Sequence, residues 1–543
     1  MRFDEGSRAL YASDSSNYRQ MPIGVVVPRD AEDVEQAVAA CRRHAAPIVS
    51  RGAGTSLAGQ ACNVAVVLDM SKYMNRILDL DPERRIARVQ PGVVLDDLRA
   101  AAERHHLTFG PDPATHNRCT LGGMIGNNSC GVHSLMAGKM DENVVEMEVL
   151  TYSGLRLQAG SVSNNDLRRI VAEGGERGQI FARLEVLRDR YAGLIRERYP
   201  NIPRRVSGYN LDYLLPERGF HLSRALVGSE GTCATVLEAT VRLVESPRSR
   251  VLLILGFPDV FTACDHVPQI LLSGPVGLEG FDDSLIASMR QKRLRLREIE
   301  SLPPGGGWLL VEFGGQTRGE AESRARILIE QLRQFPDQPN IKLVLDPAEQ
   351  QGMWDVRESA LGGTAVVPGE PITWPGWEDA AVPPERLGEY LRDFRGLAER
   401  FGYKAAFYGH FGQGCIHTRI DFDFTSPTGR EAFRSFIEQS ADLVVGYGGS
   451  LSGEHGDGQA RGELLERMFG SDLVQAFREF KAIWDPENRM NPGKVVDARP
   501  LDSDLRLASF HPPAVSTHFA FTEEEGFESA VLRCVGVGKC RRH

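Results

Sequence analysis

The chain has 543 residues, of which 42% are hydrophobic and 25% charged, and its formal net charge at pH 7 is -10. This length is enough for two or more packed domains, and the negative charge argues against a nucleic-acid partner, because phosphate binding depends on clustered Lys and Arg. The best apolar run, residues 251–257, has only the length of a strand, and the amino terminus has no apolar core, so neither a transmembrane segment nor a secretory signal is predicted.

Helical and strand patterns alternate along the first half of the chain. A helix is predicted after Asp30, which can cap it, because the apolar residues that follow fall on one helical stripe. Strands are predicted at residues 47–50, 64–68, 86–89, 144–152 and 234–244, and residues 160–200 are predicted to be largely helical.

A second unit of strands and helices begins near residue 250. Residues 251–257, 308–315 and 341–346 are strand-like, and residues 321–335 form a predicted helix between the last two strands. Such units are typical of a mixed sheet with helices packed on it. The chain is helical again from residue 464, and residues 500–530, rich in Ser, Pro and acidic residues, are predicted to be a linker.

A glycine-rich loop, RGAGTSLAGQ at residues 51–60, joins the two strands at 47–50 and 64–68. Its glycines, Gly52, Gly54 and Gly59, permit backbone angles that can turn successive N–H groups inward as an anion cradle. Pyrophosphate is the natural occupant, with further donors from Arg51, Thr55 and Ser56. A plain turn between two strands is an equally good interpretation of this loop alone. A Rossmann site is excluded, because no helix follows the glycines.

Two more segments favour a large flat ligand. Residues 111–131, PDPATHNRCTLGGMIGNNSCG, are dense in Gly and Asn and too polar for a core, and residues 227–232, VGSEGT, precede the strand at 234–244. In this order and spacing the three segments resemble those of the vanillyl-alcohol-oxidase type of FAD flavoproteins, over about residues 17–247.

This resemblance implies that FAD is the cofactor. Residues 51–56, including Ala53, would hold the pyrophosphate, and Glu230 and Gly231 would lie near the adenosine end. The ribityl chain and flavin would contact Pro111, Asp112, Thr120, Gly122, Gly123, Ile125, Asn127, Asn128 and Gly131, and Gly59, Pro91 and Gly92 complete the expected contacts. His116 and Cys119 lie where some relatives tether the flavin, but we expect non-covalent FAD.

A predicted hairpin in the second half, AAFYGHFGQGCIHTRIDF at residues 405–422, brings His410 close to His417. A glycine-rich loop at residues 451–458 supplies Glu454 and His455. Two imidazoles and a carboxylate suit Zn²⁺, Mn²⁺ or Fe²⁺ better than Ca²⁺ or Mg²⁺. Two solvent-facing histidines on a hairpin are the alternative, which the Gly-x-Gly turn and the polar shared face disfavour.

The hairpin also resembles the GHxGDGNxH signature of the D-2-hydroxyacid dehydrogenases in this superfamily. The resemblance implies that His410, His417 and Glu454 are metal ligands and that His455 is the general base. Gln413 stands where Asp is usual and Cys415 where Asn is usual, which indicates a distinct branch and weakens any inference about the exact substrate.

The implied substrate is an anionic 2-hydroxy acid, D-2-hydroxyglutarate ahead of D-lactate or glycolate. A cation should meet its carboxylate: Arg357 resembles the family's substrate arginine, and Arg419 shares a strand face with His417. For each arginine a structural salt bridge is the alternative. Near residue 377, where the hydroxyglutarate signature places a lysine, the chain reads Trp377-Glu378-Asp379, so the second carboxylate would need another partner.

The resemblance implies an α+β architecture: a two-subdomain FAD-binding fold of the p-cresol methylhydroxylase type, and an α/β cap, or substrate, domain with an antiparallel sheet. The expected domains are FAD-binding 1–247, substrate and metal-binding 248–460, a helical return 461–500, and a linker with the start of an iron–sulfur segment 501–543. Asn491 and Lys494 in the return resemble the family's closing motif beside the flavin.

The chain has nine cysteines, and seven are scattered singly, which indicates reduced thiols and a cytoplasmic protein. The tail RCVGVGKCRRH, with Cys534 and Cys540, resembles the opening of a 4Fe-4S module fused to long bacterial members. Two thiolates cannot complete such a cluster, so a 4Fe-4S centre is expected only in a longer parent protein.

The expected electron acceptor is a quinone or carrier, which electrons would reach through that cluster. Through this acceptor the protein could attach peripherally to the inner membrane, and a homodimer is one assembly that we consider. Two alternatives to the dehydrogenase remain open. An ether-lipid synthase of the same superfamily uses FAD without net oxidation, and a flavin electron-transfer subunit would need no His410, His417 or Glu454.

Overall fold

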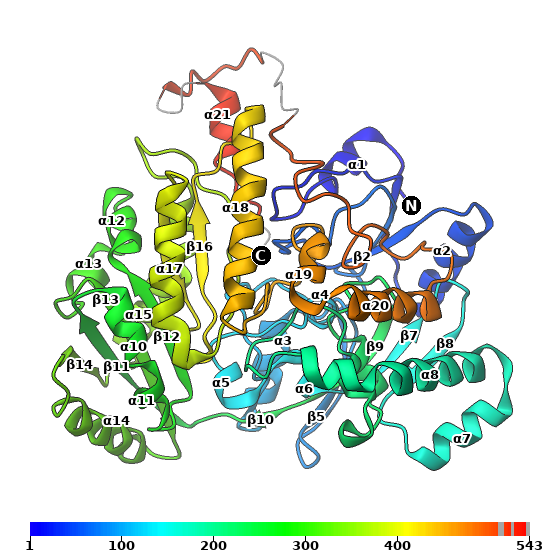
Figure 1. Cartoon of the computed structure of the whole chain (residues 1–543), viewed down its shortest axis with the longest axis horizontal. Coiled ribbons are helices and arrows are strands. Elements are labelled where there is room, and N and C mark those ends of the chain that lie inside the picture. Colours follow the sequence, from blue (N-terminus) through cyan, green and yellow to red (C-terminus); the bar gives the residue numbers. More distant parts are fainter. Residues whose placement is uncertain (509–514, 523–525, 539–543) are drawn as a thin grey trace.

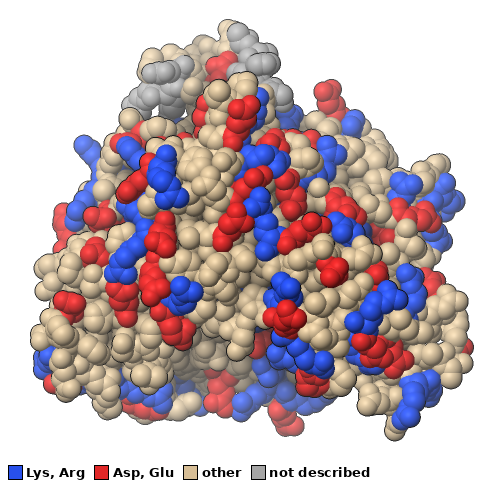
Figure 2. Space-filling view, viewed as in Figure 1, with Lys and Arg blue, Asp and Glu red and all other residues tan. Residues whose placement is uncertain are grey.

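The computed structural model describes residues 1–508, 515–522 and 526–538, and within them the strands form four sheets. In Figure 1 the first half of the chain and helix α20 (Ser471–Trp484) lie on one side, and the sheet built from residues 249–420 lies on the other. Basic and acidic side chains are mixed over the face seen in Figure 2. None of the described helices is both long and apolar enough to cross a membrane.

A small parallel sheet carries the first glycine-rich loop. Its strands, in the order β1-β3-β2, are β1 (Gly24–Val26), β2 (Ile48–Arg51) and β3 (Val66–Asp69). Helix α2 (Ala31–Arg43) is capped by Asp30, and its buried apolar stripe packs against the sheet. The predicted helix and strands are confirmed, and no helix lies in the loop between β2 and β3.

A five-stranded antiparallel sheet completes this half, in the order β4-β5-β9-β7-β8. Its strands are β4 (Ile77–Asp81), β5 (Ile86–Val89), β7 (Val144–Leu150), β8 (Arg156–Ala159) and β9 (Thr235–Arg242). The short pair β6 (Leu107–Thr108) and β10 (Val244–Glu245) leads toward the second half. The helices of this half are α3 (Leu95–Glu103), α4 (Leu121–Asn127), α5 (Ser134–Ala137), α6 (Met140–Asn143), α7 (Asn164–Glu173), α8 (Gly175–Arg198) and α9 (Leu222–Leu226).

The second half is built on a six-stranded antiparallel sheet, in the order β14-β11-β13-β12-β15-β16. Its strands are β11 (Ser249–Phe257), β12 (Gly277–Asp282), β13 (Gly307–Gly315), β14 (Asn340–Val344), β15 (Ala405–Gly409) and β16 (His417–Ile420). Alternate side chains of β11 enter two different cores, so both faces are covered. One face holds α10 (Val260–Asp265), α14 (Arg318–Leu332) and α17 (Leu387–Arg400), and the other holds α12 (Asp283–Gln291), α15 (Pro347–Glu358) and α16 (Ala360–Ala365).

After α18 (Pro427–Gly446) the chain returns to the first half. Helix α20 packs on α8, and Met490 forms a bridge to Ile48 of the small sheet. The Tyr18 hydroxyl donates to the carbonyl of Leu501, 2.7 Å away, and Leu501 is fully buried. The first residues of the predicted linker are therefore packed against the amino-terminal segment.

A buried ion pair fastens this return, and we expect its loss to destabilise the fold. Lys481 donates to Asp485 Oδ2 at 2.8 Å, to the carbonyl of Thr232 at 2.8 Å and to that of Met490 at 3.0 Å. Lys481→Met leaves the Asp485 carboxylate buried and unpaired, which costs about 3–5 kcal/mol, and it should lower the melting temperature measured by circular dichroism. Lys481→Met with Asp485→Asn should recover part of this loss, and a single variant as stable as the parent would contradict the assignment.

Candidate active site

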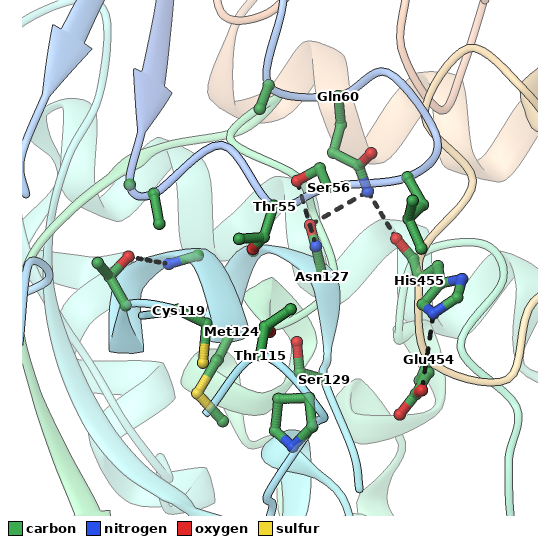
Figure 3. Close-up of a pocket in the computed structure, with 18 of the residues that line it drawn as sticks. Thr55, Ser56, Gln60, Thr115, Cys119, Met124, Asn127, Ser129, Glu454 and His455 are labelled. Carbon is green, nitrogen blue, oxygen red and sulfur yellow. Dashed lines mark hydrogen bonds and ion pairs between the residues drawn. The ribbon is translucent and has the colours of Figure 1, made fainter. Parts of the chain in front are cut away.

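A cleft with about 1790 Å³ of empty space, its open mouth included, runs between the two halves. The first half contributes parts of all three glycine-rich segments, and the second contributes α15, the β15–β16 hairpin and the loop with Glu454 and His455. Figure 3 shows Thr55, Ser56 and Asn127 on one side of this cleft and His455 and Glu454 at its other side.

The β2–β3 loop approaches α4 so closely that side chains are excluded. A Cβ on Gly52 would lie 2.0 Å from Thr120 Oγ1, and Gly54 has φ +73°. The Arg51 side chain, which we expect to add donors for the phosphates, also lines the cleft. Its guanidinium donates to the carbonyls of Tyr11, Ser13 and Ala61 at 2.8–3.1 Å, and these bonds tie the loop to neighbouring segments. The other donors available to an anion are backbone N–H groups and the hydroxyls of this loop.

Helix α4 presents the second segment to the cleft. Its cap Thr120 and its residues Gly122, Gly123, Ile125 and Asn127 all line the cleft, as predicted. Gly122 lets the helix contact Pro91, since a Cβ there would lie 2.6 Å from the Pro91 side chain. Asn127 accepts from Gln60, which also donates to the carbonyl of His455 at 2.6 Å (Figure 3), so the loop of the second half is tied to both FAD segments.

The hairpin places two imidazoles on one carboxylate oxygen. The Nε2 atoms of His410 and His417 each lie 3.1 Å from Glu454 Oε1, and the two rings are 5.0 Å apart between centroids. The opposite nitrogens are engaged elsewhere: His410 Nδ1 bonds Glu279 Oε1 at 2.6 Å, and His417 Nδ1 donates to the carbonyl of Glu378 at 2.8 Å. Such outer partners fix the ring orientation of metal-ligating histidines. The three predicted ligands are therefore brought together, with the Nε2 atoms of both histidines facing the same oxygen of Glu454.

Arg204, which the sequence did not single out, holds the other oxygen of Glu454. Its fully buried guanidinium donates to Glu454 Oε2 at 3.0 Å and to Gln413 Oε1 at 2.7 Å. Burial alone would raise the pKa of Glu454, but His410 and Arg204 together bring it well below its usual range. Gln413 stands where the family has Asp. It is a neutral acceptor and does not compensate the charge of Arg204, so Glu454 is the carboxylate that pairs with this arginine.

His455 is oriented by Glu378, a second residue that the sequence did not single out. Its Nδ1 lies 3.1 Å from Glu378 Oε1, and its ring stacks on His417 with centroids 5.0 Å apart. Burial lowers the pKa of His455, but Asp379 and Glu378 more than offset this and raise it to about 9. Arg461 donates to Glu378 at 2.7 Å and, against the burial that would raise it, holds the pKa of that carboxyl well below its usual range.

Asp379 also lies within ligand distance of His417, Glu454 and His455. Its carboxylate, however, accepts the backbone N–H groups of Gly453, Glu454 and His455. These bonds shape the loop that carries the site, so we assign Asp379 to the loop and not to a metal.

The two candidate substrate arginines both line the cleft, but their partners differ. Arg357 is paired with Glu279 Oε2 at 2.7 Å. Arg419 donates to the hydroxyl and carbonyl of Thr373 and has no ion pair among the described residues. Burial lowers the pKa of Arg419 to about 10, so it stays charged at neutral pH. Of the two candidate substrate arginines, Arg419 is therefore the one without an acidic partner among the described residues.

Comparison with known families accounts for both halves of this arrangement. Residues 22–160 match the FAD binding domain, and residues 246–495 match the C-terminal domain of FAD linked oxidases. The chain has the two domains of an FAD-linked oxidase.

Relatives and solved structures agree with these domains. The chain is 31% identical to D-2-hydroxyglutarate dehydrogenase of Pseudomonas putida over 99% of its own length and 54% of that protein, and 29% identical to glycolate oxidase subunit GlcD of Escherichia coli K12 over 94% of its length and 90% of that protein. It thus spans about half the length of the D-2-hydroxyglutarate dehydrogenases it matches. p-Cresol methylhydroxylase with substrate bound has the same fold, with a TM-score of 0.62 at 16% identity over 91% of this chain and 93% of that one. The α+β fold of the p-cresol methylhydroxylase type is confirmed.

Eight of the predicted cofactor contacts do not line the cleft: Gly59, Gly92, Pro111, Asp112, Asn128, Gly131, Asn491 and Lys494. Asp112 lines a neighbouring cavity. Asn128 has φ +54° at the end of α4 and donates to Asp141, and Asn491 donates to the carbonyls of Gln60 and Glu230. These residues occupy fixed positions in the motifs because they support the segments that line the cleft. Glu230 and Gly231 do line the cleft, but the Glu230 carboxylate accepts N–H groups of Asp457 and Gly458, and burial raises its pKa to about 8.

Neither candidate tether of the FAD-linked oxidase is free to react. Burial raises the pKa of the Cys119 thiol to about 12, so almost no thiolate forms at neutral pH. His116 is bonded to Asp96 through Nδ1 at 2.7 Å and does not line the cleft. Both observations favour non-covalent FAD.

Gly122→Ala tests the contact between α4 and Pro91. The added Cβ overpacks a tight contact at a cost of about 1–3 kcal/mol, which would weaken FAD binding about 5- to 150-fold as measured by the 450 nm to 280 nm absorbance ratio after dialysis. Gly193→Ala, where a Cβ meets nothing within 4 Å, is the control and should retain the flavin. Equal flavin content in both variants would contradict this account.

Proposed function

We propose that this chain is the flavin-bearing part of an FAD-dependent dehydrogenase that oxidises a D-2-hydroxy acid to the 2-oxo acid. The single observation that carries the proposal is the convergence of His410, His417, Glu454 and His455 at the end of the cleft that the FAD segments line. The names of the relatives, D-2-hydroxyglutarate dehydrogenase and glycolate oxidase subunit GlcD among them, support the same class of reaction. We expect D-2-hydroxyglutarate ahead of D-lactate and glycolate.

The donor set fits a divalent metal ion. The Nε2 atoms of His410 and His417 each lie 3.1 Å from one carboxylate oxygen of Glu454, and such N and O ligands suit Zn²⁺, Mn²⁺ or Fe²⁺. When bound, such an ion would polarise the substrate hydroxyl and lower its pKa. Arg204 keeps Glu454 ionised for this purpose, because its guanidinium neutralises the oxygen that faces away from the histidines.

His455 is placed to accept the hydroxyl proton. Glu378 bonds its Nδ1 and so fixes the tautomer in which Nε2 is the free acceptor, as a carboxylate partner does for a catalytic histidine. Without a cation nearby the carboxylates hold a proton on this ring at neutral pH, since they raise its pKa to about 9. A positive charge bound by the neighbouring ligands would lower that pKa into the working range of a base.

Arg419 is the residue we assign to the substrate carboxylate. A buried guanidinium without an acidic partner gains from a bound anion, whereas Arg357 already pairs with Glu279. Glu378 stands near the position where the family signature has a lysine and faces His455, so Arg419 and Arg357 are the cations left for a second carboxylate.

FAD supplies the hydride acceptor when it is bound. The chain's part is to hold the hydroxy acid in the cleft that the FAD segments line and to exclude water. A quinone or carrier would take the electrons, through a 4Fe-4S cluster in a longer protein. Cys534 is exposed, and Cys540 lies outside the described residues.

His417→Ala tests the metal and base arrangement. We expect the protein to keep its yellow colour but to lose metal, measured by mass spectrometry, and to lose flavin reduction by D-2-hydroxyglutarate by at least about 100-fold, since even outer partners of metal ligands are worth about 10–100-fold. His105→Ala, an exposed histidine, is the control. Flavin reduction at the parental rate in the His417 variant would refute the proposal.

Arg419→Gln tests the anion anchor. Loss of a charged hydrogen bond costs about 1.5–3 kcal/mol, so KM for D-2-hydroxyglutarate should rise about 10- to 150-fold, whereas flavin content stays constant. Arg419→Lys keeps the positive charge but loses the planar guanidinium, so its KM should lie between those of the parent and of the Gln variant. An unchanged KM in the Gln variant would exclude this role.

A further inference from the structure

A second cavity, with about 1530 Å³ of empty space when its open mouth is included, reaches the candidate site from another direction. It lies between the first half of the chain, at α3 and the segment 112–133, and the second half, at β11, β13 and α15. It shares His410, Arg357, Glu358 and Ala114 with the cleft that the FAD segments line. Its inner end is therefore at a candidate metal ligand and at a candidate substrate arginine.

The walls of this second cavity are strongly basic, although the whole chain carries a net charge of -10. Its lining includes Arg99, Arg248, Arg250, Arg318 and Arg357, against three carboxylates, those of Asp112, Glu312 and Glu358. Two histidines add to the positive charge. The pKa of His133 is about 10, because Asp112 and Glu312 outweigh its burial, and the pKa of His116 is about 9, because it bonds Asp96 and Glu358.

The carboxylates of this cavity are already engaged. His133 lies between Asp112 and Glu312, with its Nε2 2.8 Å from Glu312 Oε2, and His116 Nε2 lies 3.7 Å from Glu358. The exposed arginines at the outer end, Arg248 and Arg318, have no ion pair among the described residues. The mouth of the cavity therefore presents positive charge to solvent, whereas the arginines deeper in the wall are paired, Arg99 with Asp112 at 4.0 Å, Arg250 with Glu312 at 3.6 Å and Arg357 with Glu279 at 2.7 Å.

We infer that this arginine-lined cavity is the entrance through which the anionic hydroxy acid reaches His410 and Arg357 while FAD fills the other cleft. The inference rests on the proposed function for the identity of the anion. A cavity lined by one sign of charge with low-dielectric walls focuses the field and raises the local concentration and on-rate of an oppositely charged ligand by about 10–10³. The attraction acts on the charge of the ligand, so a dianion gains more than a monoanion.

The test reverses the two unpaired charges at the mouth, Arg248→Glu with Arg318→Glu, in the holoenzyme. At ~10 mM ionic strength, where the Debye length is about 30 Å, kcat/KM for D-2-hydroxyglutarate should fall at least about tenfold, at the low end of the range for charged clefts. The loss should be smaller for the monoanion D-lactate and should nearly vanish at ~1 M salt, where the Debye length is about 3 Å. Values of kcat and flavin content should not change. Arg43→Glu with Arg290→Glu changes the net charge equally at exposed positions that line neither cavity, and it should leave kcat/KM within twofold, as an order-of-magnitude bound.

A second measurement separates this inference from the proposed function. The association rate of 2-oxoglutarate with the oxidised holoenzyme, followed by the change in flavin absorbance, needs no turnover. It should fall with salt in the parent and lose that dependence in the Arg248/Arg318 variant. An equal loss of kcat/KM in the Arg43/Arg290 control, or a loss that high salt does not relieve, would show that this cavity is not the entrance. Absence of flavin reduction by all three hydroxy acids, with 2-oxoglutarate association still steered, would reject the proposed reaction and leave the entrance standing.

Discussion

Glu454 divides its two oxygens between two tasks, and the rest of the site is arranged around that division. Oε1 faces the Nε2 atoms of His410 and His417, and Oε2 is held by the buried guanidinium of Arg204. A buried charge with one partner removed costs about 3–5 kcal/mol, so the loss of the carboxylate, the arginine or an imidazole would destabilise the groups that remain. The hydrogen bonds at the Nδ1 atoms of both histidines then direct both Nε2 atoms toward the same oxygen of Glu454.

Close backbone approach is the second constraint, and it joins the site to the flavin segments. Asp379 gathers the N–H groups of the loop that carries Glu454 and His455, and Gln60 reaches from the first glycine-rich loop to the carbonyl of His455. Glu230 binds the same loop from the third segment. The loop is thus shaped by residues of both halves, which brings the FAD segments and the proposed metal ligands, far apart in the sequence, to one cleft.

Two of the departures from the family pattern have different consequences. Gln413 is a neutral acceptor for Arg204, so the positive charge of that arginine remains available to Glu454. Glu378, near the position of the family's lysine, binds His455 and Arg461. In the reaction that we propose, Arg419 and Arg357 would therefore meet the anion, and the cavity behind Arg357 would be the path by which it arrives.

Much of this protein could be predicted from local patterns alone. Strand and helix periodicity predicted α2 and strands of the three larger sheets, and the hairpin and loop motifs, with their resemblance to the family signature, singled out His410, His417, Glu454 and His455. Motif spacing could not separate residues that line the cleft from those that support it, such as Asn128 and Asn491, because both kinds are required at fixed positions. It also could not show that Arg51 binds backbone carbonyls, or that Arg204, Glu279 and Glu378 complete the site. Those roles depend on which distant side chains share a buried volume, and only the tertiary packing brings their charges within bonding distance.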